Sequence, residues 1–129
     1  ISAEVKEFPV EKKLNDTTSF NIFSLTDAFG RRDKKNLWLL YTEALENSSV
    51  EEVNGVLLWQ IKNMLLVATA SGPSVEGMKP FVFKKTQSFV QNYTTKELKE
   101  IMKKLTKAFH GRDIYNTLEV QVENIILSL

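Results

Sequence analysis

A chain of 129 residues with a net charge of +1, 43% hydrophobic and 26% charged residues has the size and composition of one soluble globular domain. The absence of cysteine excludes disulfides and cysteine-ligated metals, and a single histidine, His110, makes a histidine-ligated metal site unexpected. The most apolar run, residues 56–68, contains Lys62 and is shorter than the ~20 residues that cross a bilayer. We therefore expect a buried helix there, no membrane partner and no cofactor.

The chain is predicted to be all-α, because only five glycines and three prolines interrupt it and apolar residues recur at spacings of three and four. Residues 1–17 are interpreted as the tail of a preceding domain or a linker, with a short helix over residues 3–8. Since the first residue is Ile1, we expect a piece of a longer protein. Residues 18–129 are predicted to form a single compact bundle of about five to six helices.

The first two helices of this bundle are separated by a polar turn over residues 30–33. The first begins near Thr18 or Ser19 and ends at Gly30 and Arg31, and Asp33 caps the second. We interpret the turn as structural. The apolar residues expected on the core side of the two helices are Phe20, Ile22, Phe23, Leu25, Phe29, Leu37, Leu40, Tyr41, Ala44 and Leu45.

A long central helix follows, opened by a capping box at residues 49–52 and ending near Ala70. The next helix begins at Pro80, because proline suits the first turn of a helix. Phe81, Phe83, Phe89 and Val90 are expected to face the core of the bundle, and Lys84, Lys85 and Gln87 the solvent.

A second capping signal at residues 94–97 opens an amphipathic helix, which Gly111 closes. The last helix is predicted from about Asn116. The amphipathic stripe of the first of these helices consists of Leu98, Ile101, Met102, Leu105, Ala108 and Phe109. The last helix runs through Leu118, Val120, Val122, Ile125, Ile126 and Leu127.

Charge is distributed unevenly, with five acids and one base in residues 36–76 but nine bases and two acids in residues 79–112. Lysines placed four apart on the amphipathic helix form a ridge that can contact phosphates, or a solvated face. His110 and Arg112 lie near the end of that helix, where a ring or guanidinium can stack on an unpaired base; for His110 a helix-capping role is the alternative. The ridge consists of Lys99, Lys103 and Lys107, with Lys96 and Lys104 beside it.

No catalytic constellation is found in the sequence. Cysteine–histidine chemistry and glycine-rich phosphate loops are absent, and Glu51 and Glu52 are adjacent on a helix, so their side chains diverge. The chain is predicted not to be an enzyme and to take no small-molecule substrate. Trp38, Tyr41 and Trp59 lie on or near apolar faces and are interpreted as core or subunit-interface residues.

Four segments, in this order, resemble the C-terminal helical domain of the delta subunit of the bacterial DNA polymerase III clamp loader. The segment NIFSLTDAFGRRDKKNLWLLYTEALENS is similar to the family's opening helix, charged turn and second helix. VEEVNGVLLWQIKNMLL is similar to the next helix, with Gln60 and Lys62 matching its polar patch. KPFVFKKTQSFVQNYTTKELKEIMKKL and GRDIYNTLEVQVENIILSL resemble the later helices. The residues matching the first segment are Asn21, Ile22, Phe23, Asp27, Ala28, Gly30, Arg31 and Asp33.

The resemblance covers roughly residues 18–129 and has departures. Lys79 stands where the family usually has histidine, residues 109–111 replace a Leu-Lys-x-Gly pattern, and the connection over residues 72–79 is shorter than usual. These departures affect local loop contacts.

The resemblance implies a non-catalytic collar domain that joins delta to the ATPase subunits and to delta prime in a hetero-pentamer. This ring loads the sliding clamp on primed DNA in the bacterial cytoplasm; any polymerase activity belongs to the holoenzyme. The family's contact with the sliding clamp lies in another, N-terminal domain. Primed DNA is a possible partner of the lysine ridge. Two alternatives remain open, a stand-alone nucleic-acid-binding helical domain and a helical adaptor for another protein.

Overall fold

The computed structural model describes residues 21–110 and 117–129, which form six α-helices and no strand. The predicted all-α bundle is confirmed. The expectations for residues 1–17, for Thr18 to Phe20, for Gly111 and Arg112 and for Asn116 lie outside the described residues. The helices are α2 (Ile22–Arg31), α3 (Lys34–Asn47), α4 (Val50–Ala68), α5 (Pro80–Val90), α6 (Thr95–His110) and α7 (Leu118–Leu127).

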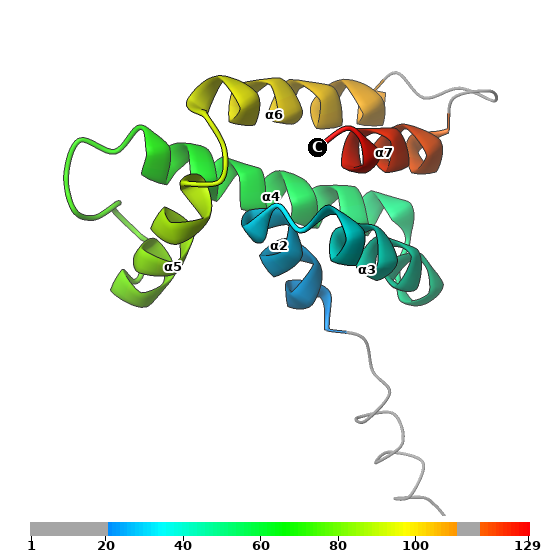
Figure 1. Cartoon of the computed structure of the whole chain (residues 1–129), viewed down its shortest axis with the longest axis horizontal. Helices are drawn as coiled ribbons and strands as arrows, with labels where there is room; N and C mark the ends of the chain where they lie inside the picture. Colours follow the sequence, from blue (N-terminus) through cyan, green and yellow to red (C-terminus); the bar gives the residue numbers. More distant parts are fainter. Residues whose placement is uncertain (1–20, 111–116) are drawn as a thin grey trace, which may run out of the picture.

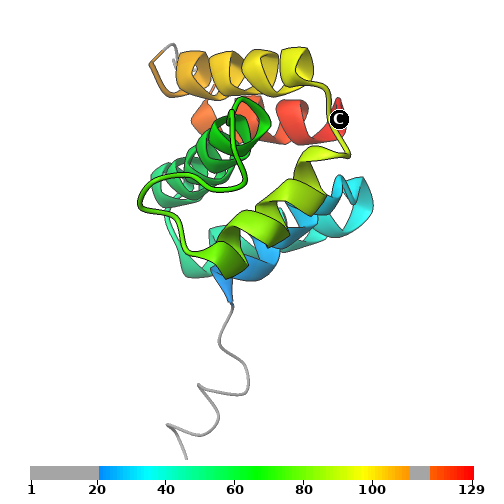
Figure 2. The ribbon, with the colours of Figure 1, turned by 90° about the vertical axis from the view of Figure 1, so that its left-hand side faces the viewer.

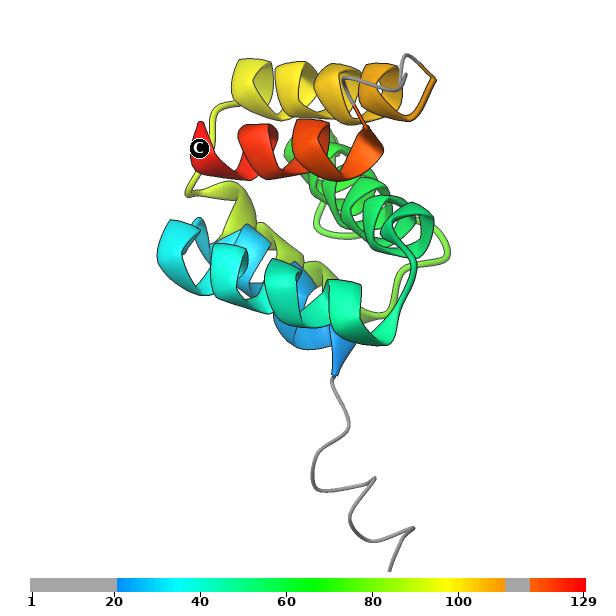
Figure 3. The same cartoon turned by 90° about the vertical axis from the view of Figure 1, so that its right-hand side faces the viewer.

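The long helix α4 lies at the centre and packs against each of the other five described helices (Figure 1). Helices α6 and α7 lie side by side along one side of it, and α2, α3 and α5 lie along the other (Figure 3). Figure 2 shows α5 beside α2, with α6 at the opposite edge of the molecule. Leu57, Ile61 and Met64 of α4 are almost fully buried and connect the two sides of the core.

The predicted helix starts are confirmed where the structure describes them. Asp33 accepts a hydrogen bond from the backbone N–H of Asn36, and Pro80 is in the first turn of α5. Both predicted capping boxes are present, Ser49 with Glu52 and Thr94 with Glu97. In each, the hydroxyl of the first residue accepts a hydrogen bond from the backbone N–H of the glutamate, and the glutamate carboxylate accepts one from the backbone N–H of the first residue. Local side-chain chemistry therefore sets where these helices begin.

Two phenylalanines predicted to face the core, Phe23 and Phe81, are exposed instead. On α5 the buried face consists of Phe83, Thr86 and Phe89, at spacings of three. Because successive residues of an α-helix are rotated by about 100°, Phe81, two residues before Phe83, lies on nearly the opposite side. The predictions that Phe23 and Phe81 face the core were therefore wrong. On α5 the apolar composition of the segment did not indicate which side of the helix would be buried.

The turn between α2 and α3 is connected to the start of α6 through Arg32. Arg32 has a left-handed backbone (φ 58°) and its N–H groups donate to both carboxylate oxygens of Glu97, at 2.8 and 3.1 Å. The guanidinium also donates to the carbonyl of Asn92 at 2.9 Å and lies 4.7 Å from the ring centroid of Tyr93. These contacts support the structural interpretation of the turn.

Gly30 permits a close approach between α2 and α5. A Cβ placed on Gly30 would lie closer than 3.0 Å to three ring atoms of Phe89, which is itself buried. The carbonyl of Gly30 also accepts a hydrogen bond from the Asn92 side chain at 2.9 Å. Glycine at position 30 therefore allows α2 and α5 to pack closely, in addition to lying near the end of α2.

Gly30→Ala is expected to destabilise the fold by about 1–3 kcal/mol, because the buried ring of Phe89 must shift to admit the methyl group. Gly55→Ala is the matched control. Gly55 lies within α4, and a Cβ placed on it would have nothing within 4 Å, so alanine there is expected to stabilise by about 0.5–1 kcal/mol. Urea unfolding of both variants measures the difference, and equal unfolding midpoints would contradict the packing role.

The Arg32–Glu97 pair makes stability depend on acid pH. Hydrogen bonds from Arg32, followed by that from the Thr94 backbone, lower the pKa of Glu97 from 4.5 to about 2. A lowered pKa in the folded state stabilises the fold above the unfolded pKa, and this stabilisation is lost as pH falls through the folded value. We expect the stability difference between the parent chain and Glu97→Gln to shrink from pH 5 to pH 2 in urea unfolding. Glu100→Gln, on the same helix but outside this pair, is the control for the loss of one carboxylate.

Candidate functional site

Three exposed aromatic side chains from three helices form what we call the aromatic surface: Phe23 of α2, Trp59 of α4 and Phe81 of α5. Their exposed fractions are 60%, 49% and 75%. The rings of Phe23 and Trp59 meet edge to face with centroids 6.5 Å apart. Single exposed apolar residues are ordinary, but a group of them is typical of a binding surface.

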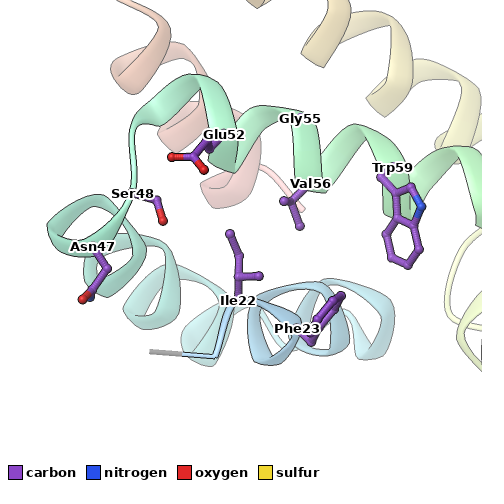
Figure 4. A pocket seen from close by; sticks show the side chains of 8 residues that line it. All are labelled: Ile22, Phe23, Asn47, Ser48, Glu52, Gly55, Val56 and Trp59. Atoms are coloured by element: carbon purple, nitrogen blue, oxygen red, sulfur yellow. The ribbon is translucent and has the colours of Figure 1, made fainter. Parts of the chain in front are cut away.

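A depression of about 710 Å³ lies next to this surface, between α2 and α4. In Figure 4, Val56 and Trp59 project from α4 toward α2, and Ile22 projects from α2 toward α4. The apolar wall therefore comes from two helices that are packed together by the core. The rim near the end of α3 is polar and includes Asn47, Ser48 and Glu52.

A second depression, of about 210 Å³, continues the aromatic surface toward α5 and shares Phe23 and Trp59 with the first. At its edge Lys85 forms an ion pair with Asp27, with Nζ 3.1 Å from the carboxylate. The buried side chain of Gln60 donates to the carbonyl of Thr26 at 2.9 Å and so fixes α4 against α2. Gln60, noted in the sequence as part of a polar patch, has a structural role here.

The three residues predicted for the core or a subunit interface have different environments. Tyr41 is 1% exposed, its hydroxyl donates to the carbonyl of Glu119 at 2.7 Å, and burial raises the pKa of its phenol. The structure thus places Tyr41 in the core rather than at an interface. Trp38 is half-buried and donates from Nε1 to Glu123 at 3.3 Å, between α3 and α7. Trp59 alone of the three belongs to the aromatic surface.

The lysines of the predicted ridge are exposed. They belong to α6, a helix at the edge of the molecule (Figure 1). None of the five ridge lysines forms an ion pair with another residue in the described ranges 21–110 and 117–129. They are Lys96, Lys99, Lys103, Lys104 and Lys107.

Two of these lysines line a depression that the structure describes. Lys104 and Lys107 line a depression of about 300 Å³ between α6 and α7, together with Gln121 and Asn124. The sequence reasoning missed both amides, because nothing local shows which helix packs beside α6. His110 is exposed in the last turn of α6, with its ring edge to face on Phe109 at 5.3 Å.

Neither a metal site nor a membrane span emerges from the described part of the chain. It contains no group of three or more histidine, cysteine, aspartate or glutamate side chains able to hold a metal ion. None of its helices combines the length and the apolar character needed to cross a bilayer.

Trp59→Ala is expected to lower the free energy of unfolding by only about 1–2 kcal/mol, because half of the side chain is already in water. Leu57→Ala, two residues away and 2% exposed, should cost about 2–5 kcal/mol. Urea unfolding of the two variants tests this order. A loss above about 3 kcal/mol for Trp59→Ala would mean that Trp59 acts as a core residue.

Comparisons of the chain with models of protein families, with curated proteins and with solved structures found no match. The likeness to the clamp-loader delta subunit therefore rests on the four sequence segments described above.

Proposed function

We propose that this chain is a non-catalytic assembly domain, the collar domain of a clamp-loader delta subunit, which joins the ATPase subunits and delta prime. The order of the four sequence segments supports this assignment, and so does the all-α fold that the resemblance implied. The observation that carries the proposal is the aromatic surface of Phe23, Trp59 and Phe81, because exposed aromatic residues on neighbouring helices are typical of protein interfaces.

The composition of the aromatic surface favours a protein partner. Tryptophan and other aromatic residues are enriched at the centres of protein interfaces, where they fill pockets on the partner and are surrounded by polar groups. Here the rings of Phe23 and Trp59 stand between two depressions, so an incoming side chain can pack on either side of them.

The shape and charge of the larger depression specify the partner further. It lies between two packed helices, α2 and α4, and a groove of this kind accepts the apolar face of another helix. Its rim carries the carboxylate of Glu52 and no lysine or arginine. The occupant that we propose is therefore a collar helix of a neighbouring clamp-loader subunit, with apolar side chains flanked by a basic residue.

The partner test uses gel filtration with light scattering on this chain mixed with the clamp-loader ATPase subunit and delta prime of the same organism. We expect one stoichiometric complex of about five chains. Phe23→Ala/Trp59→Ala should weaken assembly at least tenfold, while the melting temperature falls by about 5–10 °C and the variant stays folded at the temperature of the assay. Both side chains are exposed, so their removal acts mainly on the interface.

Leu39→Ala/Leu127→Ala is the matched control, since these two leucines are about half exposed on α3 and α7, away from the aromatic surface. It should assemble like the parent chain. If the parent chain elutes alone, the clamp-loader assignment is wrong. If both double variants assemble equally well, the collar assignment stands but the aromatic surface is not its interface.

A further inference from the structure

We infer that the aromatic surface binds a second copy of this chain when no other partner is present. In this two-fold dimer, Phe81 of each copy enters the other copy's groove between α2 and α4, the larger depression of about 710 Å³. The dimer excludes the helix of a neighbouring subunit, because both occupy the same groove. The inference needs only this chain, so it does not rest on the clamp-loader assignment.

Phe81 has the properties of an interface anchor. Its exposed fraction of 75% is the largest among the big hydrophobic side chains of the described residues. It lies in the first turn of α5, a helix that packs against both α2 and α4, so the ring is presented from a fixed element. An aromatic group that is already held in place loses little conformational freedom on binding.

The groove offers an apolar site for such a ring. Ile22 and Val56 project into it from opposite walls, and Phe23 and Trp59 lie at one end (Figure 4). Gly55 is part of the wall, and a Cβ placed on it would have nothing within 4 Å. An incoming side chain can therefore approach the backbone of α4 closely.

The order of these features across the surface makes the contact reciprocal. The groove lies on one side of the Phe23–Trp59 pair, and Phe81 lies on the other side, in the second depression that the pair also lines. A two-fold axis in the plane of contact, passing by this pair, places Phe81 of each copy over the groove of the other. Such a contact is closed, so association stops at the dimer.

The charges beside Phe81 and beside the groove are complementary. Lys84 is exposed and follows Phe81 by three residues, on the same side of α5, whereas Lys85 is already paired with Asp27. The rim of the groove carries Glu52, whose capping hydrogen bonds are accepted by Oε1, so Oε2 can accept from an ammonium group. Two Lys84–Glu52 pairs thus flank the apolar contact and fix its register.

The size of the surface makes the dimer weak. The three aromatic side chains together expose roughly 300–400 Å² per copy, given the 150–250 Å² that each buries in full. A standard stable interface buries about 800 Å² per partner. We therefore expect a Kd on the order of 100 µM, so the dimer forms at high concentration of the free chain and yields to a tighter partner.

Sedimentation equilibrium of the chain alone, from about 10 µM to about 1 mM, tests the inference. We expect a monomer–dimer equilibrium with no larger species. Phe81→Ala should weaken dimerisation at least fivefold and leave the melting temperature unchanged, because the ring is mostly in water in the single chain. Leu39→Ala/Leu127→Ala, the control with two exposed leucines on α3 and α7, should dimerise like the parent chain.

Two charge reversals test the register of the dimer. Glu52→Lys places two lysines opposite each other in each half of the contact, and Lys84→Glu places two glutamates there. Each variant alone should associate at least fivefold more weakly than the parent chain, whereas an equimolar mixture should regain the parental affinity, because both ion pairs are restored. If Glu52→Lys is poorly folded, since Glu52 also caps α4, Asn47→Lys on the same rim replaces it in the mixture.

Several outcomes would overturn the inference. It fails if the chain is monomeric at every concentration, if it grows beyond a dimer, or if Phe81→Ala dimerises like the parent chain. It also fails if the mixture of charge variants associates no better than either variant alone, which would place the contact on another face. None of these outcomes bears on the clamp-loader assignment, which the mixture with the ATPase subunit and delta prime decides.

Discussion

The packing of α4 against all five other described helices is the constraint on which the rest of the structure depends. Its buried residues, among them Leu57, Ile61 and Met64, are shared by both sides of the core, so removing any of them affects both sides. Only one narrow strip of α4 stays in contact with water, and it carries Gly55 and Trp59. The aromatic surface lies along this strip because every other face of the helix is covered.

One packing contact and one ion pair fix the positions of α5 and α6 relative to α2. Gly30 lets the ring of Phe89 approach the α2 backbone, and Arg32 connects the end of α2 with Glu97 at the start of α6. Both contacts depend on the backbone at the end of α2, because Gly30 has no side chain and Arg32 has a left-handed backbone. The position of Phe81 beside Phe23 and Trp59 follows from these contacts, although none of the three takes part in them.

The aromatic surface and the lysines of α6 are on different helices and differ in chemistry. The aromatic surface involves α2, α4 and α5 and would bury apolar area against a protein helix, whereas α6 presents exposed positive charge. Figure 2 shows α6 at the opposite edge of the molecule from α2 and α5.

The sequence by itself determined the helices and their starts, because the capping groups at Asp33, Ser49 and Thr94 act within three residues of their partners. It also placed the ridge lysines on one helix face. Only the tertiary structure decided which aromatic residues are buried and which lysines meet the amides of α7. Tyr41 is in the core whereas Phe81 is in water, although both lie in amphipathic helices. Burial depends on which helix packs against which face, and that choice is made by contacts far apart in the chain, which local spacing does not encode.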